Sequence, residues 1–380
     1  MASTFAGKSL ARAAPVRAQR PAAARAAARA NAYTEELKAT AATITAAGHG
    51  IMAMDESNGT CGQRLDAIGV ENTEDNRRRY RELLVTTKGL GEYISGAILF
   101  EETLFQSCED GTSFVDALNA NGIVPGIKVD TGLKPLTGCE GESWCSGLDT
   151  LADRCASYYK QGARFAKWRT AVNVAAGPSD IAIQEAAHGL ARYGAICQEN
   201  GLVPIIEPEV LLDGEHDIDT TYAVALKTWS AVFKAMADYG VDNEAILLKP
   251  SMVTPGADAA KKEDPETVAK YTLKMLNNVV PPAVPGIMFL SGGQSEMEAT
   301  LNLNAMNQEP NPWHVSFSYA RALQNTVLKT WVGQDENKAA AQAKLIGRAM
   351  ANSKAQLGTY DPSGEDESAA EGMYVKNYTY

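Results

Sequence analysis

The chain has 380 residues, of which 45% are apolar and 21% are charged, and its formal net charge is −11. This composition argues against a disordered chain or a coiled coil, and no apolar run reaches the roughly 18 residues that a transmembrane helix needs. Six cysteines without a CxxC pair argue against a disulfide scaffold and a structural zinc site. The negative charge argues against binding to nucleic acid, because phosphate backbones require a basic surface.

Residues 1–31 differ in composition from the rest of the chain. Their basic side chains are Lys8, Arg12, Arg17, Arg20, Arg25 and Arg29, and the first acidic residue is Glu35. An alanine- and arginine-rich segment without acids is typical of a mitochondrial or chloroplast transit peptide, whereas a secretory signal would have a continuous apolar centre. We expect residues 1–31 to be a disordered transit peptide that is removed. The alternative is an N-terminal arm that stays attached.

Two helices are predicted near the start of the remaining chain. The first begins at Thr34, because two acidic residues follow it near the positive end of the helix dipole, and glycines at positions 48 and 50 are expected to end it. Its inward face is predicted to comprise Leu37, Ala41 and Ile44. The second begins at Thr73, and its inward face is predicted to comprise Tyr80, Leu83 and Leu84.

Short apolar runs, each ended by a polar residue or glycine, alternate with helical patterns along the chain. The runs are residues 50–54, 96–100, 122–129, 163–168, 202–206, 245–248, 286–290 and 314–317. Helical patterns include residues 178–199, 220–239, 264–278 and 294–303. Eight strand–helix repeats predict a (β/α)8 barrel, a TIM barrel, as a single domain over residues 32–360. The alternative is an open doubly wound sheet, but the sequence has no GxGxxG or Walker A pattern.

Charged residues end most of these runs, and active residues of such barrels lie at the carboxyl ends of the strands. They are Asp55, Glu56, Glu101, Glu102, Lys128, Asp130, Lys167, Arg169, Glu207, Glu209, Lys249 and Arg321. A barrel core does not accept unpaired charges, so these side chains must pair with each other or meet a charged ligand.

Lys249 follows three apolar residues, so its stem is expected to be buried. Burial and a second nearby cation, such as Lys167, would lower the pKa of its amine and make it a nucleophile for a Schiff base. The alternative is a structural ion pair between Lys249 and Glu207 or Glu209. The two glutamates stand at spacing i, i+2, so both side chains point to one side of an extended segment. One could then transfer protons while the other pairs with a cation. The alternative is that both are acidic residues at the start of a helix.

A glycine turn and an arginine suit a phosphate. Ser291, Gly292 and Gly293 follow the seventh run, and Arg321 follows the eighth, where barrels often bind phosphate. Lys128, Arg169 and Arg64 could hold a second phosphate at the opposite rim, although each alone is more often a solvated base. The four histidines are scattered without HxxxH or HExxH spacing, so no metal site is expected.

The stretches at the strand ends together resemble one family. They read DESNG at 55–59, GIKVD at 126–130, AKWR at 166–169, EPE at 207–209, LKP at 248–250, FLSGGQSE at 289–296 and FSYARAL at 317–323. The chain resembles class I, Schiff-base, fructose-bisphosphate aldolases in their plastid form, from about residue 33 to residue 380.

The resemblance implies a role for each candidate residue. Lys249 would form the imine with the C2 carbonyl, Asp55 would handle the C4 hydroxyl proton, and Glu207 would be the general acid and base of carbinolamine dehydration. Lys167 and Glu209 would support them. The residues implied for the C1 phosphate are Ser291, Gly292, Gly293 and Arg321, and those toward the C6 phosphate are Ser57, Arg64, Lys128 and Arg169.

The resemblance also implies the setting of the reaction. The substrates would be a sugar bisphosphate and triose phosphates, with no cofactor or metal, in a homotetramer of the chloroplast stroma that binds neither membrane nor nucleic acid. A tetrose phosphate could replace the triose and give sedoheptulose 1,7-bisphosphate. The tail, residues 361–380, would be a flexible lid that carries Tyr380, the tyrosine that protonates the enamine, although a frayed terminus is the alternative.

The chain departs from the family pattern at two positions. Ala320 stands where glycine is usual, so its Cβ could crowd the phosphate beside Arg321, and Thr60 replaces a serine. Cys61 is expected to be exposed near the substrate and open to thiol modification, with a buried inert thiol as the alternative. Two rival functions are a transaldolase-like Schiff-base barrel and a non-catalytic scaffold on the aldolase fold.

Overall fold

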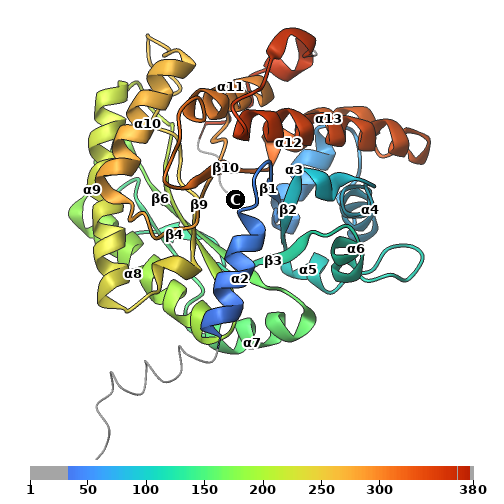
Figure 1. The fold of residues 1–380 in the computed structure, drawn as a ribbon, viewed down its shortest axis with the longest axis horizontal. Helices are drawn as coiled ribbons and strands as arrows, with labels where there is room; N and C mark the ends of the chain where they lie inside the picture. The colour runs from blue at the N-terminus through green and yellow to red at the C-terminus, as the bar shows by residue number, and fades with distance from the viewer. Residues whose placement is uncertain (1–32, 366, 377–380) are drawn as a thin grey trace, which may run out of the picture.

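The computed structural model describes residues 33–365 and 367–376. Within them, parallel strands form a closed barrel in the order β1-β10-β9-β8-β7-β6-β3-β2 (Figure 1). The strands are β1 (Gly50–Met54), β2 (Ile94–Leu99), β3 (Val124–Lys128), β6 (Phe165–Val172), β7 (Val203–Val210), β8 (Leu247–Leu248), β9 (Gly286–Phe289) and β10 (His314–Tyr319). Each of the eight predicted runs overlaps one barrel strand, so the predicted (β/α)8 barrel is confirmed. The predicted transit peptide, residues 1–31, lies outside the described residues.

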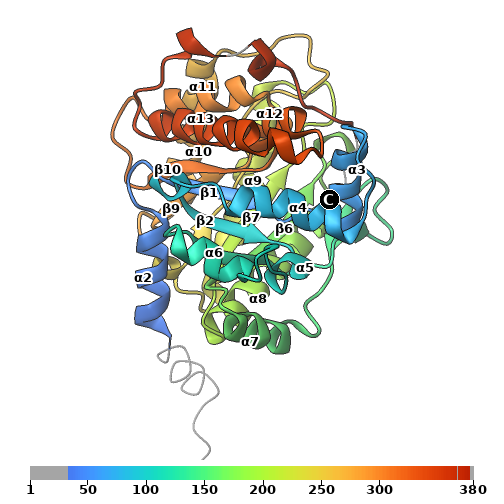
Figure 2. The same ribbon diagram turned by 90° about the vertical axis from the view of Figure 1, so that its right-hand side faces the viewer.

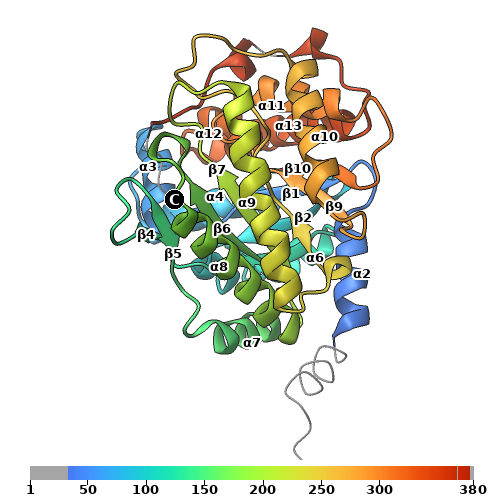
Figure 3. The same cartoon turned by 90° about the vertical axis from the view of Figure 1, so that its left-hand side faces the viewer.

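Helices follow the strands around the outside of the barrel. The α-helices are α2 (Thr34–Ile44), α3 (Asn58–Asp66), α4 (Glu74–Val85), α5 (Glu101–Leu104), α6 (Phe114–Ala120), α7 (Leu151–Gln161), α8 (Asp180–Glu199), α9 (Ile218–Asp238), α10 (Pro265–Val279), α11 (Glu296–Met306), α12 (Arg321–Trp331) and α13 (Lys338–Gln356). Short 3₁₀ helices are η1 (Leu90–Glu92), η2 (Val174–Ala176), η3 (Asn243–Ala245), η4 (Asp335–Asn337), η5 (Pro362–Gly364) and η6 (Glu367–Ala370). Figure 3 shows α8, α9 and α10 side by side over the strands. No helix in the described ranges is long and apolar enough to cross a membrane.

The helix starts agree with the capping signals. The Thr73 hydroxyl caps α4 by accepting the Asn76 N–H at 3.1 Å, and the predicted inward face of this helix is fully buried. The first helix, α2, ends at Ile44, earlier than the glycines at 48 and 50 suggest. Gly48 instead belongs to the turn, where it takes a positive φ of 77°, and Gly50 opens β1.

Helix α2 closes one end of the barrel. Its buried side chains, Leu37, Ala41 and Ile44, belong to the same apolar cluster as Phe165 and Val203 of the barrel interior. Figure 2 places α2 at one end of the strands and α3, which follows β1, at the other. Because the apolar cluster fills the α2 end, the charged side chains gather at the opposite, carboxyl end.

Several strand boundaries differ from the sequence prediction. β6 and β7 continue to Val172 and Val210, beyond the predicted ends at 168 and 206, because their charged residues still lie in the hydrogen-bonded ladder. β8 has only two residues, since the preceding ones form η3. A hairpin of β4 (Leu133–Pro135) and β5 (Ser143–Cys145), which no apolar run predicted, follows β3.

Candidate active site

The alternation of side chains along each strand brings the charged residues into the barrel. In β7, Val203 and Ile205 belong to the interior cluster, and the next inward positions are Glu207 and Glu209. In β6, Phe165 is followed on the same face by Lys167 and Arg169. The inner face is therefore apolar at the α2 end and ionic at the carboxyl end.

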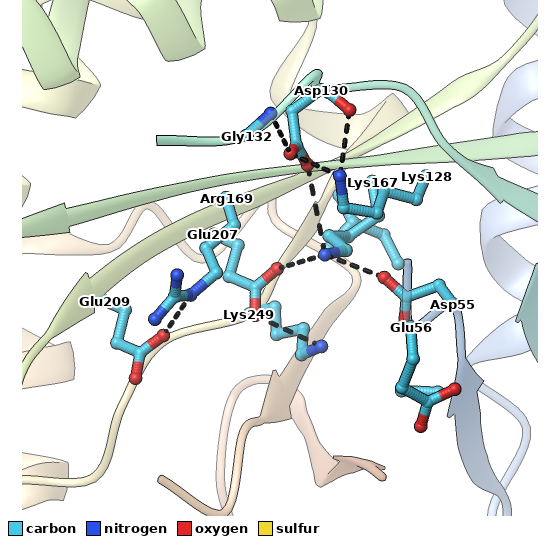
Figure 4. Close-up of polar contacts among 12 residues, drawn as sticks. Asp55, Glu56, Lys128, Asp130, Gly132, Lys167, Arg169, Glu207, Glu209 and Lys249 are labelled. Atoms are coloured by element: carbon cyan, nitrogen blue, oxygen red, sulfur yellow. Dashed lines mark hydrogen bonds and ion pairs between the residues drawn. The ribbon is translucent and has the colours of Figure 1, made fainter. Parts of the chain in front are cut away.

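Other strands repeat this pattern. Ala53 of β1 is an interior residue, and Asp55 is the next position on its face. Leu247 of β8 is also interior, and Lys249 follows it two residues later. Figure 4 shows Asp55, Lys167, Glu207 and Lys249 pointing toward one another; Lys167 and Glu207 lie in β6 and β7, and Asp55 and Lys249 directly follow β1 and β8.

Glu207 bridges two lysines. Its Oε1 lies 3.1 Å from the Lys249 Nζ, and its Oε2 lies 3.5 Å from the Lys167 Nζ. Lys167 also contacts Asp55 at 2.8 Å and Asp130 at 4.0 Å. All these side chains are buried. The expectations that Lys249 is buried and that Lys167 lies close are therefore confirmed, and the alternative ion pair with Glu207 is present as well.

The charges in this cluster shift each other's pKa values. Burial alone would raise the pKa of Asp55, but Lys167 and Lys249 outweigh it and lower that pKa to about 2. Burial would likewise depress the pKa of Lys167, but Asp55, Glu207 and Asp130 raise it well above its usual value. Lys167 is thus a permanent cation, and Asp55 is a permanent carboxylate at neutral pH.

Arg169 and Glu209 form a second pair in the same mouth. The Arg169 Nε donates to the Glu209 Oε2 at 2.5 Å, and both side chains are buried. Glu209 was expected to support Glu207 and Lys249, but the contact found for it is to Arg169. Both residues line a cavity that is also lined by Lys167, Glu207 and Lys249, so this pair forms one wall of the site.

The cavity reaches from the lysines to the predicted phosphate loop. Its lining includes Lys249, Ser291, Gly292 and Arg321. Gly292 and Gly293 have positive φ values of 57° and 96°, which favour glycine in this turn. Arg321 is the first residue of α12. The turn, the helix start and the guanidinium together could hold a phosphate.

The residues implied for the C6 phosphate lie in different places. Arg169 lines the cavity, whereas Ser57, Arg64 and Lys128 are not part of its lining. The Ser57 hydroxyl caps α3 by accepting the Thr60 N–H at 3.2 Å, and Arg64 pairs with the carboxylate of Glu56. Lys128 Nζ lies 2.5 Å from the Asp130 Oδ1. The assignment of these residues to a phosphate stays a prediction.

Three residues near the site were given no catalytic or binding role from the sequence. Asp130, one of the charged residues expected at the strand ends, lies 4.0 Å from Lys167. Tyr374 and Asp213 line the cavity and bond to each other, and no sequence pattern links them. Tyr380 lies outside the described residues.

Cys61 and Ala320, two positions near the site, were also singled out from the sequence. Cys61 is fully buried, so the expected exposed thiol is wrong: α3 turns it inward, where the Arg81 Nη1 donates to its Sγ at 3.2 Å. Burial raises the pKa of this thiol, which disfavours the reactive thiolate. Ala320 has a φ of −105°, a conformation that does not require glycine, and it lines the cavity beside Arg321.

Across residues 33–365 and 367–376, no three or more His, Cys, Asp or Glu side chains gather in an arrangement that could hold a metal ion. The cations of the described site are its lysines and arginines.

We expect the Asp55 carboxylate to make folding depend on pH. Its pKa falls from the ordinary 3.8 to about 2 on folding, so its stabilisation is present above about pH 4 and is lost as the pH falls toward 2. Asp55→Asn should lower the free energy of unfolding by about 2 kcal/mol at pH 7 and by about half as much at pH 3. Denaturant unfolding at both pH values measures this difference. Asp153→Asn, an exposed position on α7, is the control, and an equal deficit of Asp55→Asn at both pH values would contradict the prediction.

The fold and the site define a class of enzyme. A parallel barrel with a buried lysine, an adjacent carboxylate and a phosphate-type loop at its carboxyl end can capture a phosphorylated carbonyl compound through a covalent imine. This is the arrangement expected of a Schiff-base lyase.

Comparison with known proteins identifies the family within this class. Residues 36–380 match the family model described as fructose-bisphosphate aldolase class-I. The chain is 68% identical over 351 residues to chloroplastic fructose-bisphosphate aldolase 1 of Arabidopsis thaliana, covering 92% of this chain and 88% of that protein. It is 67% identical over 352 residues to chloroplastic aldolase 1 of Chlamydomonas reinhardtii, covering 93% of each. A solved fructose-bisphosphate aldolase from Plasmodium falciparum superposes with a TM-score of 0.86 at 52% identity, covering 88% of this chain and 96% of that one.

The chain belongs to the class I fructose-bisphosphate aldolase family. It is therefore a carbon–carbon lyase that cleaves fructose 1,6-bisphosphate reversibly between C3 and C4, giving glycerone phosphate and glyceraldehyde 3-phosphate. The resemblance seen in the strand-end motifs is confirmed, and the transaldolase-like and non-catalytic alternatives are set aside.

Proposed function

We propose that Lys249 carries the covalent chemistry of this aldolase. The observation that supports it is the contact of 3.1 Å between the Lys249 Nζ and the Glu207 Oε1, inside a cavity that ends at the glycine turn. At this distance Glu207 can accept a proton from the amine and later return one to the carbinolamine oxygen, so that water leaves and the imine forms.

The neighbouring charges fit the steps that follow. The protonated imine draws the electron pair of the C3–C4 bond, and the C4 hydroxyl must lose its proton as that bond breaks. Asp55, whose pKa is about 2, is ionised and can accept that proton. Lys167 holds Asp55 and Glu207 in place through contacts of 2.8 and 3.5 Å. In the reverse direction the enamine carbon attacks the aldehyde carbon, and Asp55 returns the proton to the oxygen that becomes the C4 hydroxyl.

The phosphate groups have separate proposed sites. Ser291, Gly292, Gly293 and Arg321 would hold the C1 phosphate, and Ser57, Arg64, Lys128 and Arg169 would lie toward the C6 phosphate. Arg64 and Lys128 are paired with carboxylates here, so they would have to turn to reach it. Tyr380 is proposed to protonate the enamine, with the tail over residues 361–380 as a flexible lid.

The cellular location of the reaction is proposed from the relatives and from the composition of residues 1–31. The Arabidopsis and Chlamydomonas relatives are named chloroplastic, and residues 1–31 have the composition of a transit peptide. We place the mature enzyme in the chloroplast stroma as a homotetramer that binds neither membrane nor nucleic acid. There it would also condense glycerone phosphate with a tetrose phosphate to sedoheptulose 1,7-bisphosphate.

Borohydride trapping tests the proposed chemistry. Reduction of the enzyme in the presence of glycerone phosphate should fix the substrate on one peptide, and mass mapping should place the label on Lys249. A label on Lys167 or Lys128 would overturn the assignment. Turnover should also survive treatment with EDTA, since no step uses a metal ion.

A further inference from the structure

A buried glutamine of α12 contacts the end of β1, the strand that Asp55 follows. The Gln324 Nε2 donates to the Ala53 carbonyl at 2.7 Å, and the Gln324 side chain is fully buried. The pairing between β1 and β10 stops at Met52 and Tyr319, and the chain after β10 turns into α12. The glutamine therefore supplies a contact to β1 at the level where its pairing with the neighbouring strand has ended.

The amide of Gln324 has a fixed orientation. A carbonyl oxygen only accepts hydrogen bonds, so the NH2 group of the amide must face Ala53. The other end of the amide, Oε1, accepts the Tyr80 hydroxyl at 2.6 Å, and Tyr80 of α4 is also fully buried. If either end turned away, a buried polar group would lose its partner, which is costly in the protein interior. The contact between α12 and β1 is therefore specific and rigid.

The backbone is held on both sides of Asp55. On the far side, the Arg81 Nη2 donates to the Glu56 carbonyl at 2.9 Å, and the Arg81 side chain has no exposed surface. Asp55 itself lies in the short segment between β1 and α3, and its carboxylate contacts the Lys167 Nζ at 2.8 Å. Buried side chains thus fix the backbone of this residue just beyond the end of its strand.

We propose that Gln324 is a positioning residue for Asp55, because it holds the end of β1 so that the carboxylate can reach the C4 hydroxyl during C3–C4 cleavage. The inference rests on the proposed role of Asp55 as the acceptor of that proton. Proton transfer needs a heavy-atom distance of about 2.6–3.2 Å, and a shift on the order of 1 Å can slow a reaction about 100-fold. Imine formation does not depend on this contact, since Lys249 and Glu207 stand at the ends of β8 and β7.

Gln324→Met tests the proposal because methionine has a similar size but cannot hold the Ala53 carbonyl. With enzyme in excess over fructose 1,6-bisphosphate, a single turnover should show C3–C4 cleavage slowed roughly 10- to 100-fold. The rate of borohydride trapping with glycerone phosphate should stay within about twofold of the wild type, since trapping needs the Lys249 amine but no C4 hydroxyl. A residue with a merely structural role would lower both rates by the same factor.

Gln198→Met is the matched control. Gln198 is also a buried glutamine, and its Nε2 donates to the carbonyls of Asp242 and Ala245 at 2.9 and 3.1 Å. These contacts lie at the amino end of the barrel, because η3 precedes β8. Denaturant unfolding should show a loss of stability for both glutamine variants, whereas Gln198→Met should cleave the substrate at the wild-type rate.

A combination with Asp55→Asn shows whether Gln324 acts through Asp55. The Asp55→Asn enzyme should cleave about 10²- to 10⁴-fold more slowly than the wild type, and adding Gln324→Met should change that rate by less than about twofold. If Gln324→Met slows cleavage equally in the presence and absence of Asp55→Asn, the inference fails and the role of Asp55 stands. Near-wild-type cleavage by Asp55→Asn alone would refute the role of Asp55 itself, and the inference with it.

Tyr80→Phe is a milder variant that serves if Gln324→Met does not fold. It removes only the hydroxyl that fixes one end of the amide, so cleavage should fall roughly two- to fivefold while trapping stays unchanged. Wild-type cleavage by every variant of this contact that folds would overturn the proposal, and so would a parallel loss of cleavage and trapping.

Discussion

A Lys249→Arg enzyme is expected to cleave fructose 1,6-bisphosphate more slowly than the wild type by a factor on the order of 10⁴ or more. Arginine keeps the positive charge beside Glu207, but its guanidinium is not deprotonated in proteins and cannot form the imine. Steady-state turnover, followed by coupling triose phosphate formation to a dehydrogenase, measures the loss. Borohydride should then trap no substrate on the variant.

The exposed Lys234, which pairs with Asp238 on α9, provides the control for this substitution. Lys234→Arg should retain wild-type turnover. Circular dichroism should show that Lys249→Arg is folded, since the charge is retained. Turnover of Lys249→Arg within tenfold of the wild type would show that another group forms the covalent intermediate.

Lys167→Met is expected to cause the largest loss of stability. Methionine has a similar length but no charge, so the carboxylates of Asp55, Asp130 and Glu207 would lose the cation that they share. Breaking a buried ion pair from one side typically costs about 3–5 kcal/mol, because the remaining charge stays buried without compensation. Guanidinium unfolding at pH 7 should show a deficit of this size.

The pH dependence separates this electrostatic effect from lost packing. The raised pKa of Lys167 means that its contribution is present below the ordinary pKa of 10.5 and is lost only as the pH rises above it. In Lys167→Met the unpaired carboxylates would take up protons more readily, so the deficit should shrink between pH 7 and pH 5. The control Lys234→Met, at an exposed site, should leave the free energy of unfolding at its wild-type value at both pH 7 and pH 5. A deficit of Lys167→Met that is the same at both pH values would instead indicate a packing defect.

The sequence predicted the architecture because local signals agree with the tertiary fold. Apolar runs marked all eight barrel strands, and the cap at Thr73 marked the start of α4. The strand ends were less predictable. Glu207 and Glu209 are polar, which suggests the end of a strand, yet the backbone around them continues to bond to β6. A polar side chain that faces the barrel mouth and one that ends a strand have the same local pattern.

The sequence alone determined which residues face the interior. The spacing of two between Phe165, Lys167 and Arg169 puts all of them on one side of a strand, whatever lies across from them. Their grouping with Lys249 and Asp55 followed from the barrel, because the carboxyl ends of its strands meet at one mouth.

Only the tertiary structure decided the partners. It joins Glu207 to Lys249 and Lys167, joins Glu209 to Arg169 and turns Cys61 into the protein. It also brings Tyr374 to Asp213, across 161 residues of sequence. Each of these contacts depends on distances between separate elements, to within an ångström or two, and residue type and spacing along one strand carry no information about such distances. The chemistry available in this aldolase could therefore be predicted from the chain, whereas the charge pairs that control it required the folded barrel.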